Sequence, residues 1–107
     1  MKKEKDFQKS LIKEIKDILP DSIVLKNDPT YIQGFPDLLI LHENKWAALE
    51  CKKNSKADKQ PNQDYYIDKL EKMSYASFIS PENKEEVLNE LQQAFKSRRT
   101  ACISKSK

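Results

Sequence analysis

The sequence predicts an α/β fold in which a mixed β-sheet is flanked by helices, in the order helix, strand, strand, strand, helix, strand, helix. Apolar residues recur at helical spacing in three segments, and four short runs rich in apolar residues lie between them. The length of 107 residues suits one domain. We therefore expect a single domain over residues 1–96 and a basic, disordered tail over residues 97–107.

The first helix and the first strand are predicted by two adjacent patterns. We expect the helix from Lys5 to Leu19, because Pro20 ends an apolar stripe with helical spacing. The residues of this stripe are Phe7, Leu11, Ile15 and either Ile18 or Leu19. The β-branched run 23–25 that follows predicts a short strand.

A loop separates this strand from the next. Residues 27–34 are rich in turn formers and end in Gly34, the only glycine of the protein. A single glycine directly before Phe35, Pro36 and Asp37 indicates a backbone position that a side chain would not tolerate.

The central strands are predicted to form a hairpin. Residues 37–41 and 46–51 are apolar runs of strand length, joined by the four polar residues 42–45. Side chains alternate along a strand, so Glu50 and Lys52 share one face.

The register of this hairpin follows if Leu41 pairs with Trp46. Counting outward from this pair places Asp37 opposite Glu50, with their β-carbons about 4.5–5.5 Å apart. A slip of one residue would separate the two acids.

The second half of the chain predicts two helices around one strand. Pro61 opens a helix that runs to about Met73, and the run 75–79 is a strand. Ser80 and Pro81 are then expected as the N-cap and first position of the last helix. The apolar stripe of that helix is Val87, Leu88, Leu91 and Phe95.

The opposed acids indicate a metal site. Two carboxylates that face each other at the end of an apolar hairpin repel, which destabilises a sheet. A divalent cation removes this repulsion, and oxygen ligands suit Mg²⁺, for which Mn²⁺ would substitute. Asp37 and Glu50 are the candidate ligands, with the backbone carbonyl of Cys51 as a third.

These groups are suited to phosphodiester hydrolysis. A metal can neutralise the phosphate and acidify a water molecule, and Lys52 can orient that water or stabilise the developing charge. Each residue alone is more often structural, as a strand start or an exposed edge pair. The combination of Asp37, Glu50 and Lys52 after Gly34 favours the catalytic interpretation.

Two further polar residues head apolar stripes. Glu4 lies one turn before Phe7 on the same helical face, and Gln63 precedes Tyr66 in the same way. Each either marks the point where a stripe meets solvent or points toward the acids of the sheet.

The stretch from Gly34 to Leu41, followed by Leu49-Glu50-Cys51-Lys52, resembles the PD-(D/E)XK nuclease superfamily. With Glu4 and Gln63 added, the pattern is similar to the virus-type replication-repair nuclease (VRR-NUC) family, and archaeal-type Holliday junction resolvases share most of it. The resemblance covers about residues 4–80, and it implies catalytic roles for Glu4 and Gln63. It also implies that Glu4 binds the metal, directly or through water, with Glu14 as the alternative to Glu4. It implies a restriction-endonuclease-like fold and a homodimer that cuts branched DNA, such as four-way junctions, in phage or mobile-element recombination and repair.

Basic residues are clustered although the net charge is only +3. Lysine clusters neutralise phosphates, but a lysine-rich solvated surface is an equally good explanation of the charge alone. The residues that we expect to contact DNA are Lys3, Lys5, Lys53, Lys56 and Lys59.

The cysteines, the N-terminus and the lengths of the apolar runs indicate where the protein is located. Cys51 and Cys102 make neither a disulfide framework nor a zinc set, which fits a reducing compartment. The sequence shows no signal peptide and no apolar run long enough to span a membrane. We expect a cytoplasmic protein of a bacterium or phage-infected cell, without membrane association.

Two other functions remain open. A restriction-like or nicking endonuclease on duplex DNA would use the same site, although so small a domain leaves little chain for reading bases. A non-catalytic DNA-binding module would have no need of two opposed carboxylates.

Overall fold

The computed structural model describes residues 4–28, 30–59 and 61–106, with side chains described as far as residue 96. Over these residues the chain forms three helices and four strands in the predicted order. They are α1 (Glu4–Ile18), β1 (Ile23–Lys26), β2 (Leu38–His42), β3 (Lys45–Cys51), α2 (Gln63–Met73), β4 (Tyr75–Ile79) and α3 (Lys84–Ser106).

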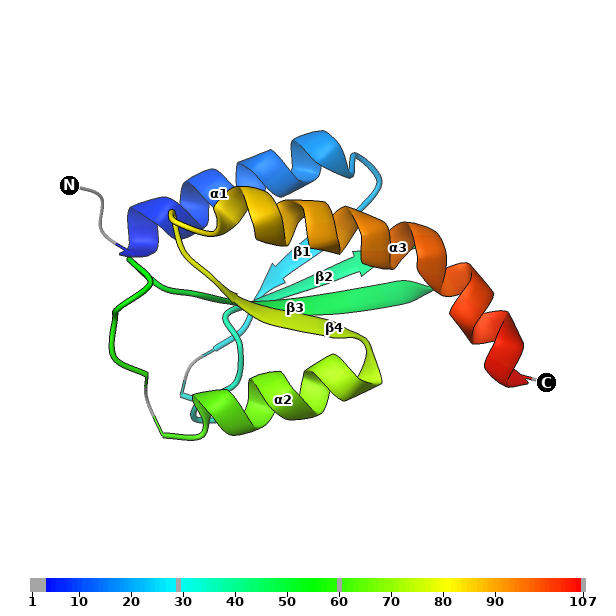
Figure 1. The fold of residues 1–107 in the computed structure, drawn as a ribbon. Helices are drawn as coiled ribbons and strands as arrows, with labels where there is room; N and C mark the ends of the chain where they lie inside the picture. The colour runs from blue at the N-terminus through cyan, green and yellow to red at the C-terminus, as the bar shows by residue number, and fades with distance from the viewer. Residues whose placement is uncertain (1–3, 29, 60, 107) are drawn as a thin grey trace.

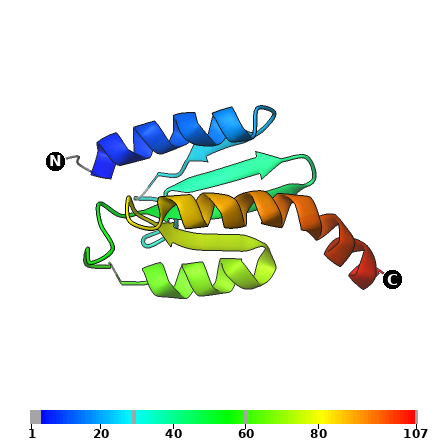
Figure 2. The same cartoon turned by 45° about the horizontal axis from the view of Figure 1, so that its top comes forward.

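The strands form one sheet in the order β1-β2-β3-β4. The first three strands pair antiparallel, and β4 pairs parallel with β3 because α2 carries the chain back across the sheet. Helices α1 and α3 cover one face and α2 covers the other, as Figures 1 and 2 show. The predicted mixed sheet with flanking helices is therefore confirmed.

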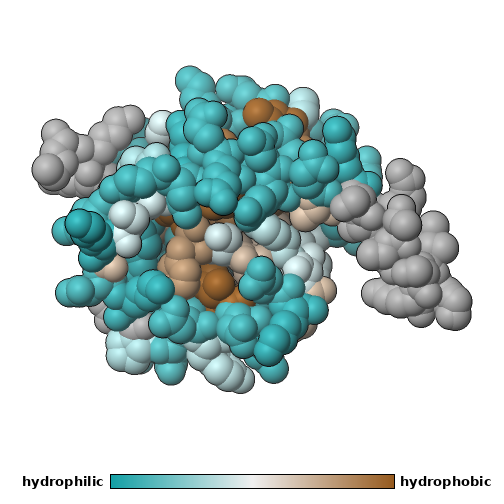
Figure 3. Space-filling model, in the orientation of Figure 1, coloured by the Kyte–Doolittle hydropathy of each residue, from teal (hydrophilic) through white to brown (hydrophobic). Residues whose placement is uncertain are grey.

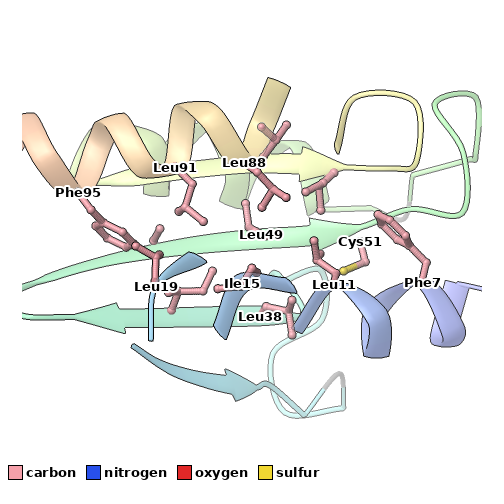
Figure 4. Close-up of a cluster of buried hydrophobic side chains, with 14 residues drawn as sticks. Phe7, Leu11, Ile15, Leu19, Leu38, Leu49, Cys51, Leu88, Leu91 and Phe95 are labelled. Atoms are coloured by element: carbon pink, nitrogen blue, oxygen red, sulfur yellow. The ribbon is translucent and has the colours of Figure 1, made fainter. Parts of the chain in front are cut away.

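The main apolar core lies between the sheet and the layer formed by α1 and α3 (Figure 4). The stripe predicted for the first helix is buried there, and so is the stripe predicted for the last helix. The largest fully buried side chains of this core are Leu11, Ile15, Leu38, Ile40, Leu49, Cys51, Ile79 and Leu91. Burial of this apolar surface is the main stabilising term of the domain.

A smaller core lies beneath α2 on the other face of the sheet. Its buried members are Ala48, Ile67, Leu70 and Ala76. On the side seen in Figure 3 both helical layers are mostly hydrophilic, apart from an apolar patch at the top, and apolar surface gathers between the layers. The helices are thus amphipathic, as their sequence periodicity predicted.

The hairpin turn and the starts of the last two helices differ from the sequence prediction by two residues or more. The hairpin ladder reaches His42 and Lys45, so two residues rather than four form the turn, and Glu43 adopts a φ of 58° there. Helix α2 begins at Gln63 rather than at Pro61, because Asn62 takes a left-handed conformation with a φ of 77°.

The third difference is the start of α3, at Lys84 rather than at Ser80. The amide of Ser80 donates to Asn83 Oδ1 at 2.8 Å, and the amide of Asn83 donates to the Ser80 carbonyl at 3.2 Å. These bonds form a turn, and the Asn83 carbonyl then accepts the first helical bond from Val87.

Helix α3 continues to Ser106, through the segment that the sequence predicts to be a basic tail. The side chains of residues 97–107 lie outside those described, so the predicted disorder of this tail remains a prediction. Within the described part of the chain, no helix has the length and apolar character needed to cross a membrane.

Candidate active site

The two acids predicted to face each other do so at the end of the β2–β3 hairpin. The pairing of Leu38 with Leu49 confirms the predicted register, which places Asp37 opposite Glu50 one residue beyond the ladder. The amide of Asp37 donates to Glu50 Oε1 at 3.2 Å, and the amide of Cys51 donates to Asp37 Oδ2 at 2.9 Å. Each carboxylate therefore binds backbone of the opposite strand.

A third carboxylate comes from α1. The starts of α1 and α2 lie at the same end of the sheet (Figure 1). Carboxylate oxygens of Glu4, Asp37 and Glu50 lie within 4.8 Å of one another. The alternative residue, Glu14, lies elsewhere, because its Oε1 accepts from Lys84 Nζ at 3.0 Å between α1 and α3.

Burial makes this cluster electrostatically unfavourable without a counter-charge. Burial raises the pKa of Glu50 to about 8, the charge of Asp37 adds to the shift, and Lys52 opposes it. Burial also raises the pKa of Asp37, against the opposing hydrogen bond from Cys51. Three carboxylates that approach within 4.8 Å fit a hard divalent cation such as Mg²⁺.

Gln63 joins the acids to the predicted catalytic lysine. Its Nε2 donates to Glu50 Oε2 at 2.8 Å, and its Oε1 accepts from Lys52 Nζ at 2.7 Å. Lys52 Nζ also donates to the backbone carbonyl of Asp58 at 3.0 Å. The side chains of Lys52 and Gln63 are buried, so this chain of bonds fixes the lysine beside Glu50.

Gly34 explains how the start of α2 reaches the sheet. It has a φ of +88°, and a β-carbon on it would lie 2.7 Å from Asn62 Cβ and 2.8 Å from the Pro61 carbonyl oxygen. The loop before Asp37 therefore packs directly against the residues that precede Gln63. Gly34, which the sequence predicts to tolerate no side chain, is therefore the point where the loop before Asp37 contacts the residues before Gln63.

The loop before β2 is also held by Asn27, the residue that follows β1. The amide of Asn27 donates to the Asp37 carbonyl, and Asn27 Nδ2 donates to the Pro36 carbonyl, both at 2.8 Å. These bonds place the backbone of Asp37 independently of its side chain, which leaves the carboxylate free to face Glu50.

The lysines predicted to contact DNA are exposed where the structure describes them. Lys5, Lys53 and Lys56 are exposed, and Lys3 lies outside the described residues. Lys59 is exposed too, but its Nζ lies 3.2 Å from Asp64 Oδ1 and 4.4 Å from the centroid of the Phe78 ring. Their contact with DNA remains a prediction.

One member of the site, the backbone carbonyl of Asp58 that accepts from Lys52, has no signal in the sequence. Every residue carries a carbonyl, so only the path of the 53–59 loop selects this one. Asp58 had no predicted role.

Comparison with solved structures shows where this fold occurs elsewhere. A chain described as a VRR_NUC domain protein superposes with a TM-score of 0.66 and 21% sequence identity, covering 90% of this chain and 92% of that chain. No family model matches the chain, and no curated protein matches it. The chain therefore has the fold of that domain protein.

Proposed function

We propose that the protein is a metal-dependent endonuclease that hydrolyses phosphodiester bonds in DNA. The observation that carries this proposal is the approach of the Glu4, Asp37 and Glu50 carboxylates within 4.8 Å, beside a lysine that Gln63 holds in place. The shared fold with a VRR_NUC domain protein supports it.

Mg²⁺ is the proposed cofactor, with Mn²⁺ as a substitute. Asp37, Glu50 and the carbonyl of Cys51 would hold it, and Glu4 would complete the set directly or through water. When bound, the ion would supply positive charge against the phosphate and lower the pKa of a water molecule. The oxygen donors and their negative charge match the preference of this ion.

The chain's own residues position the other groups. A lysine ammonium has three N–H donors, and Lys52 uses two of them on Gln63 and the Asp58 carbonyl. We assign the third to the attacking water or to the phosphate oxygen on which charge develops. Gln63 is a positioning residue, because its amide fixes the distance between Glu50 and Lys52.

Branched DNA, such as a four-way junction, is the proposed substrate, and a homodimer is the proposed active form. Two sites related by symmetry could cut two strands of one junction. The motif resemblance to the VRR-NUC and junction-resolving nucleases supports this choice, together with the small size of the domain. A role in phage or mobile-element recombination and repair would follow from it.

Cleavage of a panel of linear, flap, splayed and four-way DNA, with and without Mg²⁺, tests the proposal. We expect Asp37→Asn to reduce cleavage by more than about a hundredfold, because it removes a ligand charge where the metal acts. Asp17→Asn, which changes an exposed acid of α1, is the matched control and should cleave like the unaltered protein.

Other results would redirect the proposal. Full activity of Asp37→Asn, or activity in excess chelator, would exclude the metal mechanism. Preference for linear duplex would favour the restriction-like alternative. Binding without cleavage in both Mg²⁺ and Mn²⁺ would favour the non-catalytic DNA-binding module.

A further inference from the structure

The peptide bond between Pro36 and Asp37 is held from both of its sides. Its carbonyl, which belongs to Pro36, accepts a hydrogen bond from Asn27 Nδ2 at 2.8 Å. Its N–H, which belongs to Asp37, donates to Glu50 Oε1 at 3.2 Å. The C=O and N–H of a trans peptide point in opposite directions, so one peptide plane connects Asn27 to a candidate metal ligand.

Asn27 makes two bonds to this part of the chain. It directly follows β1, and its own amide donates to the Asp37 carbonyl at 2.8 Å. Asn27 therefore binds two successive carbonyls, those of Pro36 and Asp37. Together these bonds restrain the tilt of the Pro36–Asp37 peptide, because hydrogen bonds weaken when their geometry departs from linearity.

The side chain at position 27 has to be a donor. A carbonyl oxygen only accepts, so the group that faces Pro36 is the NH2 of the asparagine amide. An aspartate of almost the same shape would present an acceptor to an acceptor. Donation to the carbonyl also polarises the peptide, which strengthens the bond that its N–H makes to the Glu50 carboxylate.

We propose that Asn27 is a positioning residue of the metal site and acts on Glu50 through the Pro36–Asp37 peptide. This inference rests on the proposed nuclease function and extends its site to the end of β1. With Asn27 in place, the Asp37 N–H holds Oε1 of Glu50 while Gln63 holds Oε2, so both carboxylate oxygens are restrained. Without Asn27, the peptide plane is free to tilt and the restraint on Oε1 weakens.

Asn27 also has a structural role, because it closes the loop that runs from residue 28 to residue 36. A purely structural role predicts that loss of the side chain lowers stability alone. The direction of the Asp37 N–H argues for more, since it donates to a side chain of the site beyond the ladder that ends at Leu38 and Leu49. The two roles differ in one observable, which is the affinity of the site for a metal ion.

Mn²⁺ binding, measured by the electron paramagnetic resonance of the free ion, tests the proposal without any cleavage. Asn27→Ala should weaken Mn²⁺ binding by about 10- to 100-fold, the range typical for residues that orient a metal ligand. Asn27→Asp should weaken it as well. A negative charge added near a cation site would on its own strengthen binding, so a loss in this variant identifies the missing donor.

The resonance of the Asp37 amide gives a second readout, in metal-free protein. In nitrogen–proton correlation spectra of Asn27→Ala, this amide proton should shift upfield, because its bond to Glu50 weakens. It should also exchange faster with solvent than in the unaltered protein. Neither change is expected from a loss of global stability that leaves the protein folded.

Ser22→Ala is the matched control, since Ser22 precedes β1 at its other end. Its hydroxyl donates to the Leu19 carbonyl at 2.7 Å, so this variant also removes a bond from a side chain to backbone. It should lower stability in urea titrations and leave Mn²⁺ affinity and the Asp37 resonance unchanged. Equal Mn²⁺ affinity of Asn27→Ala and the unaltered protein, or an equal loss in Ser22→Ala, would overturn the proposal.

The outcomes for metal binding and for cleavage keep the two proposals apart. Unaltered protein whose Mn²⁺ affinity depends on Asn27 but which never cleaves DNA supports the positioning role and rejects the nuclease. Protein that cleaves DNA, with a Mn²⁺ affinity that is independent of Asn27, rejects the positioning role alone. Protein that binds no Mn²⁺ rejects both.

Discussion

Glu50 and Cys51 are neighbours in β3 and are buried almost equally, with 3% and 0% of their surface exposed. Their environments are opposite. Cys51 points into the apolar core beneath α1 and α3 (Figure 4), and burial raises the pKa of its thiol so that it stays neutral. Glu50 points to the other face, where it meets Asp37 and Gln63.

Neighbouring side chains of a strand point to opposite faces of the sheet, so at this point of β3 one side chain belongs to the apolar core and the next belongs to the candidate site. The side with α1 and α3 carries most of the apolar burial and thus most of the stability. The end of the sheet near Gln63 gathers the buried Glu50 and the half-buried Asp37, whose charges oppose folding until a cation or a proton neutralises them. Substitutions on the two sides should have separable effects.

The largest change in stability should come from the apolar side. Leu91 is fully buried in α3, so Leu91→Ala should lower the free energy of unfolding by about 2–5 kcal/mol in urea titrations. Cleavage per folded molecule should be retained, because the helix covers the face opposite to Glu50. Asn89→Ala, an exposed change in the same helix, is the control. Loss of cleavage by Leu91→Ala protein that is still folded would contradict the separation of the stabilising core from the candidate site.

The acids of the candidate site should make the stability of the protein depend on pH. The folded pKa of Glu50 is about 8, above its usual 4.5, so the folded state retains a proton that the unfolded chain releases. The stabilisation that this retained proton gives the folded state is present at low pH and is lost as pH rises from about 4.5 to 8. The free energy of unfolding in chelator should therefore fall across this window. Mg²⁺ should counter the fall at the upper end, because it binds the ionised form.

Urea titrations across that pH window, with and without Mg²⁺, measure this effect. Glu50→Gln serves as the control because it removes the titrating group while keeping the shape of the side chain. The variant should show a flatter dependence on pH and a smaller effect of Mg²⁺. An equal slope in both proteins would assign the pH dependence to other groups.

The sequence predicted much of this arrangement because strand alternation and hairpin pairing are local rules. Once Leu41 was paired with Trp46, the approach of Asp37 and Glu50 followed, and the structure has that register. Helical spacing likewise placed Glu4 on the buried face of α1, at the end that meets the acids. Gln63 was selected by its place at the head of a stripe, and it is buried there.

Features that depend on contacts between distant segments were not predictable in the same way. The turn at Glu43 is shorter than the polar run suggested, because a residue with positive φ is not marked by its sequence. The start of α2 depends on how Gly34 packs against Asn62, and the role of Asp58 depends on the path of its loop.

Gly34 contacts the residues before α2 within the candidate site, and its substitution should affect both stability and cleavage to a moderate degree. Gly34→Ala places a side chain at a φ of +88°, which should lower stability by about 1–3 kcal/mol. The added β-carbon should also displace the start of α2 and weaken the bonds of Gln63, so cleavage should fall. Gln33→Ala, an exposed neighbour, is the control for unfolding and cleavage assays. Unchanged cleavage by Gly34→Ala would show that the contact with Asn62 does not position the site.

The smallest effect on stability should come from the two glutamates of α1, which also tests their assignment. Glu14 and Lys84 form a partly exposed ion pair at 3.0 Å, so Glu14→Gln should cost less than about 1 kcal/mol and leave cleavage unchanged. Glu4→Gln should also alter stability little, but should raise the Mg²⁺ concentration needed for half-maximal cleavage, because it removes one of the three clustered carboxylates. The contrary result would be a raised metal requirement in Glu14→Gln and an unchanged one in Glu4→Gln. The acids of the site would then have to be reassigned, because an ion pair between α1 and α3 would be controlling the chemistry at Glu50.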